Sequence, residues 1–263
     1  MCGGFLWAKP QPVARRGAIR QYRAMTSTRR ARRAAGWMAA GGFVALAALF
    51  VAPAARAQQM AVDVELVLGI DCSYSVNSDE FDLQMRGLAQ AFESTQVQQA
   101  IQGSTRGVIA VIVVQWSDGA SQDIAVPWTL VYDANSVRRL AQAIRSAPRL
   151  SPTGATSISA MVEIGVALFN ANQFTGDRWV IDISADGFNN TGPPMPLLKR
   201  YAEINGVTLN GLAIIDEKPE LESYFQYRVI TGPGAFVITA NDYAAYGDAI
   251  RRKLLREIIK PIS

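Results

Sequence analysis

The stretch VDVELVLGIDCSYS, residues 62–75, decides the fold of this 263-residue chain. Residues 62–70 are mostly apolar, which predicts a strand that is buried on both faces. The strand is followed by Asp71, Ser73 and Ser75, one carboxylate and two hydroxyls at alternate positions. Hard oxygen ligands of this kind suit Mg²⁺ or Mn²⁺ better than softer metals. The stretch therefore predicts a metal site at the carboxyl end of a central strand.

Apolar runs of strand length alternate with longer helical patterns in the rest of the chain. This alternation predicts an α/β fold with a doubly wound, Rossmann-like, mostly parallel six-stranded sheet and helices on both faces. The short turn at 117–119 makes the strand over 123–131 an antiparallel edge strand, where Pro127 is tolerated. The expected strands are 62–70, 108–116, 123–131, 179–184, 207–215 and 235–239. The expected helices begin with one capped by Ser78 and continue with 134–147, 157–170, 196–205, 219–227 and about 242–259.

The order of the strands places the candidate ligands. In a sheet of order 3-2-1-4-5-6 the first and fourth strands are neighbours, and ligands bind in the crevice at their carboxyl ends. The fourth strand leads into Asp186-Gly187, and the loop over 151–157 carries a threonine close to a glycine. We therefore expect one site that gathers Asp71, Ser73, Ser75, Thr156 and Asp186.

These residues resemble the metal-ion-dependent adhesion site (MIDAS) of von Willebrand factor A (VWA) domains. That site is written Asp-x-Ser-x-Ser, then a Thr in a Gly-containing loop, then an Asp that commonly precedes Gly. The resemblance covers residues 61–259 and is closest to a group of exported bacterial proteins with such a domain. It implies that the two serines bind Mg²⁺ or Mn²⁺ directly, the threonine directly or through water, and the aspartates largely through water. It also implies that an Asp or Glu side chain of a partner protein completes the coordination.

The same side chains have a structural interpretation. Ser73 and Ser75 would suit the cap of the helix that follows them, and Thr156 would suit the cap of the helix beginning at Ser157. Capping and metal binding are compatible, so this interpretation stands beside the metal site.

Three further features carry expectations. Cys72 alternates away from the serines and is expected to pack under the sheet. Asp182 lies inside the fourth strand, so we expect it either to support the site with a partner or to lie at an exposed strand end. The basic cluster at 251–253, together with Arg256, is expected to face solvent near the end of the last helix.

Residues 1–57 are predicted to be an N-terminal extension and signal peptide ahead of a domain over 58–263. They hold ten of the 26 Lys and Arg residues and no Asp or Glu, and arginines at 29–33 precede an apolar stretch at 34–52. This pattern predicts export to the periplasm or beyond, by the general or the twin-arginine route. The alternative is an uncleaved leader that acts as a membrane anchor.

Composition excludes several classes of function. Beyond the leader, 16 basic residues remain against 22 acidic ones, a net charge of −6, and the basic residues are scattered. Nucleic-acid binding is therefore not expected. The chain has no His, which excludes Ser-His-Asp and Cys-His catalysis and histidine zinc sites. Cys72 is the one cysteine after the leader, so this part forms no internal disulfide.

These observations favour a non-enzymatic, metal-dependent module that binds an acidic side chain of a partner protein. The alternative is a metal-dependent hydrolase that uses the same carboxylates and hydroxyls, with Asp182 or another Asp as its base. A third interpretation is a scaffold whose site binds no metal.

Overall fold

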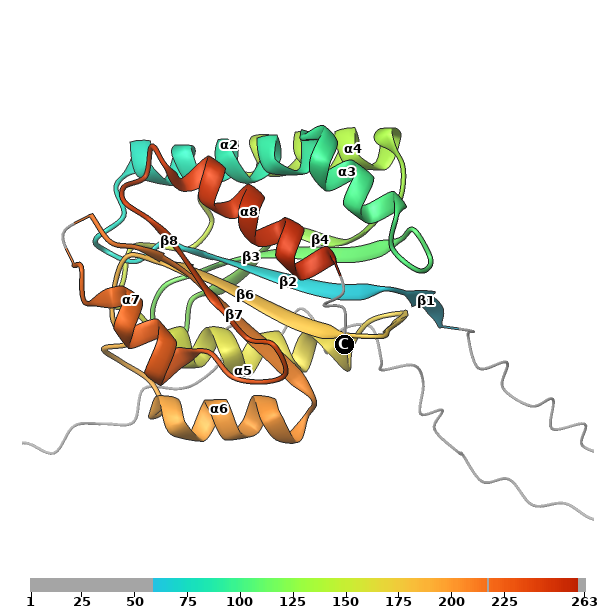
Figure 1. The fold of residues 1–263 in the computed structure, drawn as a ribbon. Coiled ribbons are helices and arrows are strands. Elements are labelled where there is room, and N and C mark those ends of the chain that lie inside the picture. The colour runs from blue at the N-terminus through green and yellow to red at the C-terminus, as the bar shows by residue number, and fades with distance from the viewer. Residues whose placement is uncertain (1–58, 217, 260–263) are drawn as a thin grey trace, which may run out of the picture. The chain divides into compact units, whose positions relative to one another are not determined.

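The computed structural model describes residues 59–216 and 218–259, so the predicted signal peptide lies outside the described residues. These residues form one large sheet between two layers of helices (Figure 1). The strands of the large sheet are β2 Val64–Asp71, β3 Ile109–Trp116, β4 Gln122–Val131, β6 Trp179–Ala185, β7 Val207–Ile214 and β8 Val237–Ala240. The helices are α2 Ser78–Glu93, α3 Thr95–Gln102, α4 Ala134–Ser146, α5 Ile158–Phe169, α6 Met195–Ile204, α7 Leu221–Tyr224 and α8 Tyr246–Ile258, with a π-helical turn η1 over Phe225–Val229.

The sheet has the predicted topology. Its strand order is β4-β3-β2-β6-β7-β8, and β4 is the antiparallel member, paired with β3. All eight residues of β2 and of β3 are buried, as expected for strands covered on both faces. Every other pair in this sheet is parallel, so the predicted doubly wound α/β fold is confirmed.

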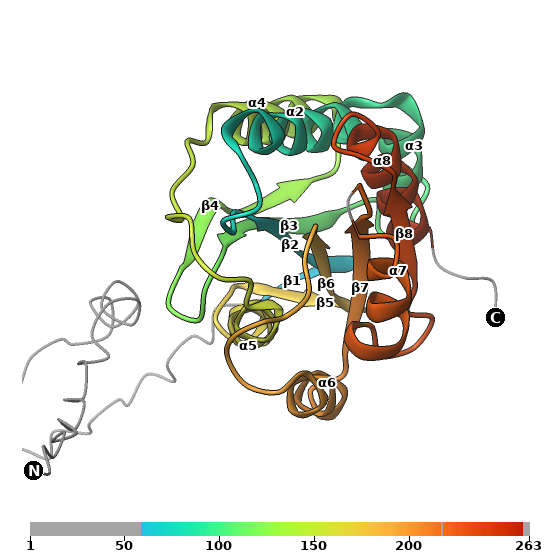
Figure 2. The same ribbon diagram turned by 90° about the vertical axis from the view of Figure 1, so that its left-hand side faces the viewer.

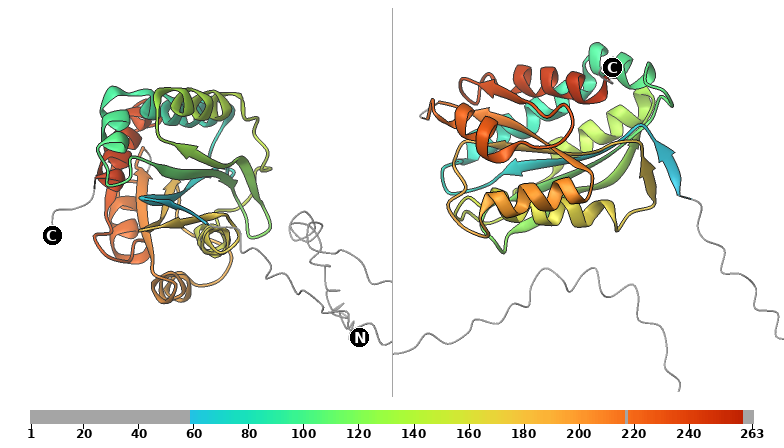
Figure 3. Two further views of the ribbon diagram at one scale, coloured as in Figure 1. Left: turned by 90° about the vertical axis from the view of Figure 1, so that its right-hand side faces the viewer. Right: turned by 60° about the horizontal axis from the view of Figure 1, so that its bottom comes forward.

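Helices cover both faces of the sheet. Viewed from one end, α2, α3, α4 and α8 lie on one face, and α5 and α6 lie on the other (Figure 2). The views from the opposite end and from below show the same layers (Figure 3). Alternate residues of a strand point to opposite faces of the sheet and belong to two separate hydrophobic cores. In β2, Leu66 and Leu68 belong to the core on the side of α2 and α8, and Val67 belongs to the core on the side of α5.

The start of α2 differs by one residue from the prediction. The cap is Asn77, not Ser78, because the Asn77 side chain accepts from the Glu80 amide at 3.0 Å. The Glu80 carboxylate in turn accepts from the Asn77 amide at 2.7 Å. This reciprocal capping box satisfies two backbone donors, whereas a cap at Ser78 would have Phe81 three residues later, which has no acceptor for the second donor.

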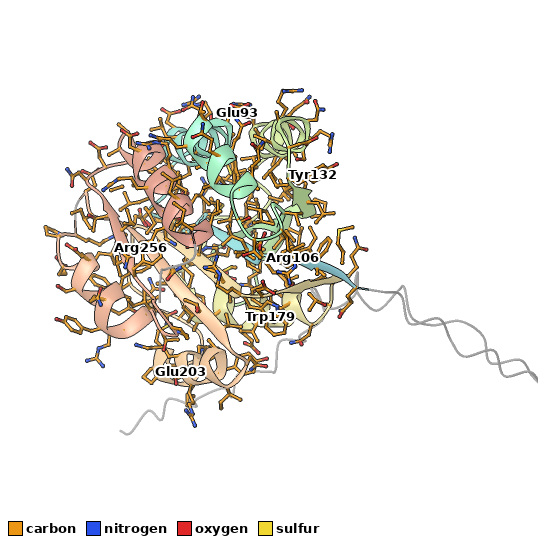
Figure 4. The ribbon with its side chains drawn as sticks, turned by 45° about the vertical axis from the view of Figure 1, so that its right-hand side comes forward. Glu93, Arg106, Tyr132, Trp179, Glu203 and Arg256 are labelled. Carbon is orange, nitrogen blue, oxygen red and sulfur yellow. The ribbon has the colours of Figure 1, made fainter. Side chains whose placement is uncertain are left out.

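A two-stranded parallel pair that we did not predict lies at the amino-terminal ends of β2 and β6. It joins β1 Met60–Val62 to β5 Phe174–Gly176. Arg106, labelled in Figure 4, lies at this end, where its backbone amide donates to the Asp63 carboxylate at 2.9 Å and its guanidinium pairs with Asp177. Three-residue strands are too short to leave a periodic signal in the sequence.

No helix among residues 59–216 and 218–259 is long and apolar enough to cross a membrane. The apolar stretch at 34–52, on which the membrane-anchor alternative rests, lies outside the described residues.

The basic cluster on α8 is only partly exposed, which corrects one expectation. Lys253 is fully buried, and its Nζ lies 2.8 Å from Asp182 Oδ1 and 2.6 Å from Glu257 Oε1. The contact with Asp182 joins two side chains that are both buried. Asp182 is therefore buried and paired, and the expectation of an exposed strand end was wrong. Arg256 is exposed, and its guanidinium lies 4.0 Å from the centre of the Phe236 ring.

Two buried carboxylates share one ammonium in this cluster. Burial raises the pKa of Asp182 to about 7, with Glu257 adding to the rise and Lys253 opposing it. Asn210 donates a further hydrogen bond to Glu257 Oε1 at 3.0 Å. A proton shared between the carboxylates would bring the net charge of the cluster to zero, which is what a dry interior requires.

Replacement of Lys253 by Met should destabilise the fold by about 3–5 kcal/mol, because it leaves two buried carboxylates without a cation. Urea unfolding followed by circular dichroism measures the loss. Arg252→Met, on the neighbouring exposed cation, should cost less than about 0.5 kcal/mol. Equal effects of the two substitutions would contradict the buried ion cluster.

Candidate metal centre

The candidate site lies at the carboxyl edge of the sheet, between two adjacent parallel strands. β2 ends at Asp71, and β6 is followed directly by Asp186. The strands are in register, with Ile70 opposite Ser184. Figure 2 faces this edge, where loops from both halves of the sheet meet.

Four of the five predicted residues form one chain of hydrogen bonds. The Ser75 hydroxyl donates to Asp186 Oδ1 at 2.6 Å, and the Ser73 and Ser75 hydroxyl oxygens lie 3.2 Å apart. The Ser73 amide donates to Asp71 Oδ1 at 2.7 Å. These contacts gather two carboxylates and two hydroxyls in one small volume.

The fifth predicted residue, Thr156, lies beside this cluster. Its Oγ1 is 3.4 Å from the point that a Cβ on Gly187 would occupy, so it borders the residue that follows Asp186. The structure thus brings the five residues to one place. Their role as metal ligands remains a prediction.

Two residues that we did not predict donate side-chain hydrogen bonds to the backbone of the loop with the two serines. The Arg149 guanidinium donates to the carbonyls of Cys72 at 2.8 Å and Val76 at 2.9 Å. Gln84 donates to the Asp71 carbonyl at 3.2 Å. Arg149 carries no local signal of this role, because the segment that it supports lies more than seventy residues earlier in the chain.

Hydrogen bonds also fix the loop that carries Thr156. The Thr156 amide donates to Asn190 Oδ1, and the Asn190 amide donates to the Thr156 carbonyl, both at 2.9 Å. Ser157, not Thr156, caps α5 by accepting from the Ala160 amide at 3.3 Å. At Gly192 the backbone has φ +85° and a Cβ would lie 2.5 Å from Ser157 Oγ, so only glycine fits there. The Thr156 hydroxyl is thereby left free of the capping role.

Asp71 carries a buried charge that the described residues do not neutralise. Its Oδ2 is buried and accepts no hydrogen bond from them. Burial, and then the nearby charge of Asp186, raise the pKa of Asp71 to about 7, while hydrogen bonds from Ser73 and from the Asp186 backbone oppose the rise. The Tyr243 hydroxyl is also buried without a partner among these residues, and burial together with the charges of Asp186 and Asp71 raises its pKa.

The residues present fit a hard divalent cation. Two carboxylates and three hydroxyls are an all-oxygen set of the kind that suits Mg²⁺ or Mn²⁺. Within residues 59–216 and 218–259, no group of three or more His, Cys, Asp or Glu side chains is placed to hold a metal. A cation beside Asp71 would give Oδ2 a partner and screen its repulsion with Asp186.

A family model described as "Protein of unknown function (DUF1194)" matches residues 61–262. The chain belongs to the DUF1194 family. A comparison of this DUF1194 chain with curated proteins finds no match.

Several solved structures share the fold, among them a von Willebrand factor type A protein. Proximal thread matrix protein 1 (PTMP1) of the mussel byssus aligns with a TM-score of 0.54 at 19% identity, over 76% of this chain and 48% of PTMP1. The pilus adhesin SpaC of Lactobacillus rhamnosus GG gives 0.53 at 16% identity, over 77% of this chain and 31% of SpaC. A von Willebrand factor type A protein of Catenulispora acidiphila aligns with a TM-score of 0.51 at 18% identity, over 76% of this chain and 43% of that protein. The DUF1194 chain thus spans less than half the length of each of these proteins.

A further structure of PTMP1, with a TM-score of 0.50 at 16% identity over 76% of this chain and 48% of that one, has zinc in its MIDAS motif. At these identities the comparisons establish a VWA-type fold.

The pKa of Asp71 predicts a pH dependence in the absence of divalent cations. An unfolded Asp loses its proton near 3.8 but folded Asp71 does so near 7, so folding stability should fall as pH rises from about 4 to about 7. Asp71→Asn should weaken this fall and, in chelator at pH 8, raise Tm by about 3 °C or more. Thermal melts in EDTA between pH 4 and 8 measure both effects.

Asp82→Asn, an exposed change on α2, is the control and should leave the pH profile unaltered. An Asp71→Asn protein that is less stable than wild type at pH 8 in chelator would show that the buried charge is compensated.

Proposed function

We propose that this DUF1194 protein is an exported protein-binding module of the adhesion type. In this proposal Asp71, Ser73, Ser75, Thr156 and Asp186 hold Mg²⁺ or Mn²⁺, and the ion captures an Asp or Glu side chain of a partner protein.

One observation carries the proposal: the buried Asp71 Oδ2 without a partner, within a cluster of oxygen side chains at an edge of the sheet where ligands bind. A buried, unsatisfied carboxylate oxygen costs stability unless something binds it. A divalent cation is the partner that this donor set suits.

The structural neighbours add support of a different kind. SpaC is a pilus adhesin, PTMP1 belongs to the byssus matrix, and PTMP1 binds zinc in its MIDAS motif. Their extracellular setting agrees with the leader-like composition of residues 1–57. We extend to this chain their general mode of action, and we keep Mg²⁺ or Mn²⁺ because its candidate donors are all hard oxygens.

The arrangement suits ligand capture. Three of the five side chains are neutral hydroxyls, so they would leave a bound ion with much of its positive charge. Such an ion supplies an open coordination position to an incoming carboxylate. Ser75 holds Asp186 Oδ1 in place, and Tyr74, 84% exposed between the two serines, offers a contact surface beside the ion.

The structure gives no reason to favour the hydrolase. That alternative needed Asp182 or another Asp as a general base, and Asp182, the residue named for the role, is buried and paired with Lys253 on the face of the sheet that α8 covers. A base must reach the proton that it removes. We therefore propose a binding role and no catalytic residues.

Metal binding should raise the melting temperature. At a Mg²⁺ or Mn²⁺ concentration of about 100 Kd, the linkage is worth about 2.7 kcal/mol, or about 5–10 °C for a domain of this size. Asp71→Asn should abolish the rise. Asp182→Asn, an equal change at a buried carboxylate outside the cluster, should keep it. A rise that survives in Asp71→Asn would contradict the assigned ligands.

Carboxylate capture should be visible on bound Mn²⁺. A short peptide with one Glu should displace water from the ion and lower the water-proton relaxation enhancement of the complex. The same peptide with Gln should not, because a neutral amide is a much weaker ligand for a hard cation. Equal behaviour of the two peptides would contradict capture of an acidic side chain.

A further inference from the structure

A lysine stands at the candidate metal centre. Lys218, in the loop between β7 and α7, donates from Nζ to the Asp186 carbonyl at 2.9 Å. Its Nζ also lies 4.0 Å from the point that a Cβ on Gly187 would take, the same point from which Thr156 Oγ1 is 3.4 Å away. The ammonium and the Thr156 hydroxyl therefore flank the same residue.

The ammonium of Lys218 keeps binding capacity. No carboxylate among the described residues forms an ion pair with it, whereas buried Lys253 has two carboxylate partners. An ammonium has three N–H donors, and the one protein acceptor that the described residues give Lys218 is the Asp186 carbonyl. The side chain is half-buried, so water reaches it and a ligand can too.

This placement matters for a domain with a net charge of −6, which repels acidic partners at long range. A cation at the metal and a second one at Lys218 would offer an acidic partner two positive charges within an acidic surface, in which Asp216 and Glu220 are exposed. One carboxylate would bind the metal, and a neighbouring one would meet the ammonium.

We propose that Lys218 binds a second acidic group of the partner, so that the site selects a segment with two neighbouring carboxylates over a segment with one. This inference rests on the proposed function, because the first carboxylate is the one held by the metal. Lys218 is then a specificity-determining residue that also joins the loops of β6 and β7.

The test uses the purified chain with Mn²⁺ and short peptides of equal length. In each of three peptides a second Glu lies one, two or three positions after the first, and in its matched control that second Glu is Gln. Peptide affinity is measured by titration, and Mn²⁺ affinity is measured separately by electron paramagnetic resonance. Wild type should bind the best two-Glu peptide about fivefold more tightly than its control.

Three variants separate charge from architecture. Lys218→Gln can still donate to the Asp186 carbonyl but lacks the charge, so it should lose the fivefold preference and keep its Mn²⁺ affinity within about twofold. Lys218→Arg should retain the preference. Lys199→Gln should also retain it, since Lys199 donates to a backbone carbonyl in the same way, to Tyr227 at 3.3 Å, but on α6.

Each contrary result has a distinct meaning. If Mn²⁺ and one-Glu peptides bind but no two-Glu peptide binds better, Lys218 only joins loops, and this inference fails while the proposed function stands. If Lys218→Gln binds Mn²⁺ more tightly and keeps the two-Glu preference, Lys218 merely repels the metal and the inference fails. If no Mn²⁺ binds, the proposed function and this inference fail together.

Discussion

The parallel pairing of β2 with β6 is the constraint on which the candidate site depends. The two strands are far apart in the sequence but are hydrogen-bonded neighbours over residues 65–70 and 179–184. Because the chain continues toward opposite edges of the sheet from these two strands, their carboxyl ends are not bridged by a direct connection. Asp71 and Asp186 meet in the crevice that results. Loops from α4 to α5 and from β7 to α7 then supply Thr156 and Lys218.

Three sets of buried acids show why this crevice differs from the rest of the interior. Glu65 is saturated by neutral donors, among them the Gly176 amide at 2.6 Å and the Trp179 indole at 2.9 Å. Asp182 shares Lys253 with Glu257. Asp71 has an oxygen without a hydrogen-bond partner and a second carboxylate nearby, and unlike the Asp182 and Glu257 pair it has no cation paired with it in the described part of the chain. Glu65 is satisfied by donors. The Asp182 and Glu257 pair has a cation within the protein, although three of its oxygens accept no hydrogen bond from the described residues. Asp71 would gain a counter-charge only from a ligand.

The sequence predicted the parts of this architecture that depend on local pattern. The buried run over 62–70 indicated the central strand, and the polar residues that end it are three of the five candidate ligands that the structure brings together. The burial of Lys253 was missed because adjacent arginines suggested a solvated face, although its spacing from Ile250 and Glu257 places it on the apolar side of α8. Arg149 and Lys218 could not be found in this way, since each contacts a loop distant in sequence and neither contact leaves a periodic trace.

The polar contacts of α8 tie the two buried acidic regions together. Lys253 meets Asp182 in the middle of β6, and the Tyr246 hydroxyl lies 3.2 Å from the Ser184 hydroxyl nearer its end. Tyr243, just before the helix, is close enough to Asp186 for the charge of Asp186 to raise its pKa. A shift of α8 along the sheet would separate Lys253 from Asp182 on β6 and leave that buried carboxylate without its cation, at a cost of about 3–5 kcal/mol, while Glu257, on α8 itself, would move with Lys253. The ion pair with Asp182 therefore fixes the position of α8 along the sheet. In this position the Tyr243 hydroxyl lies near the carboxylates of Asp71 and Asp186.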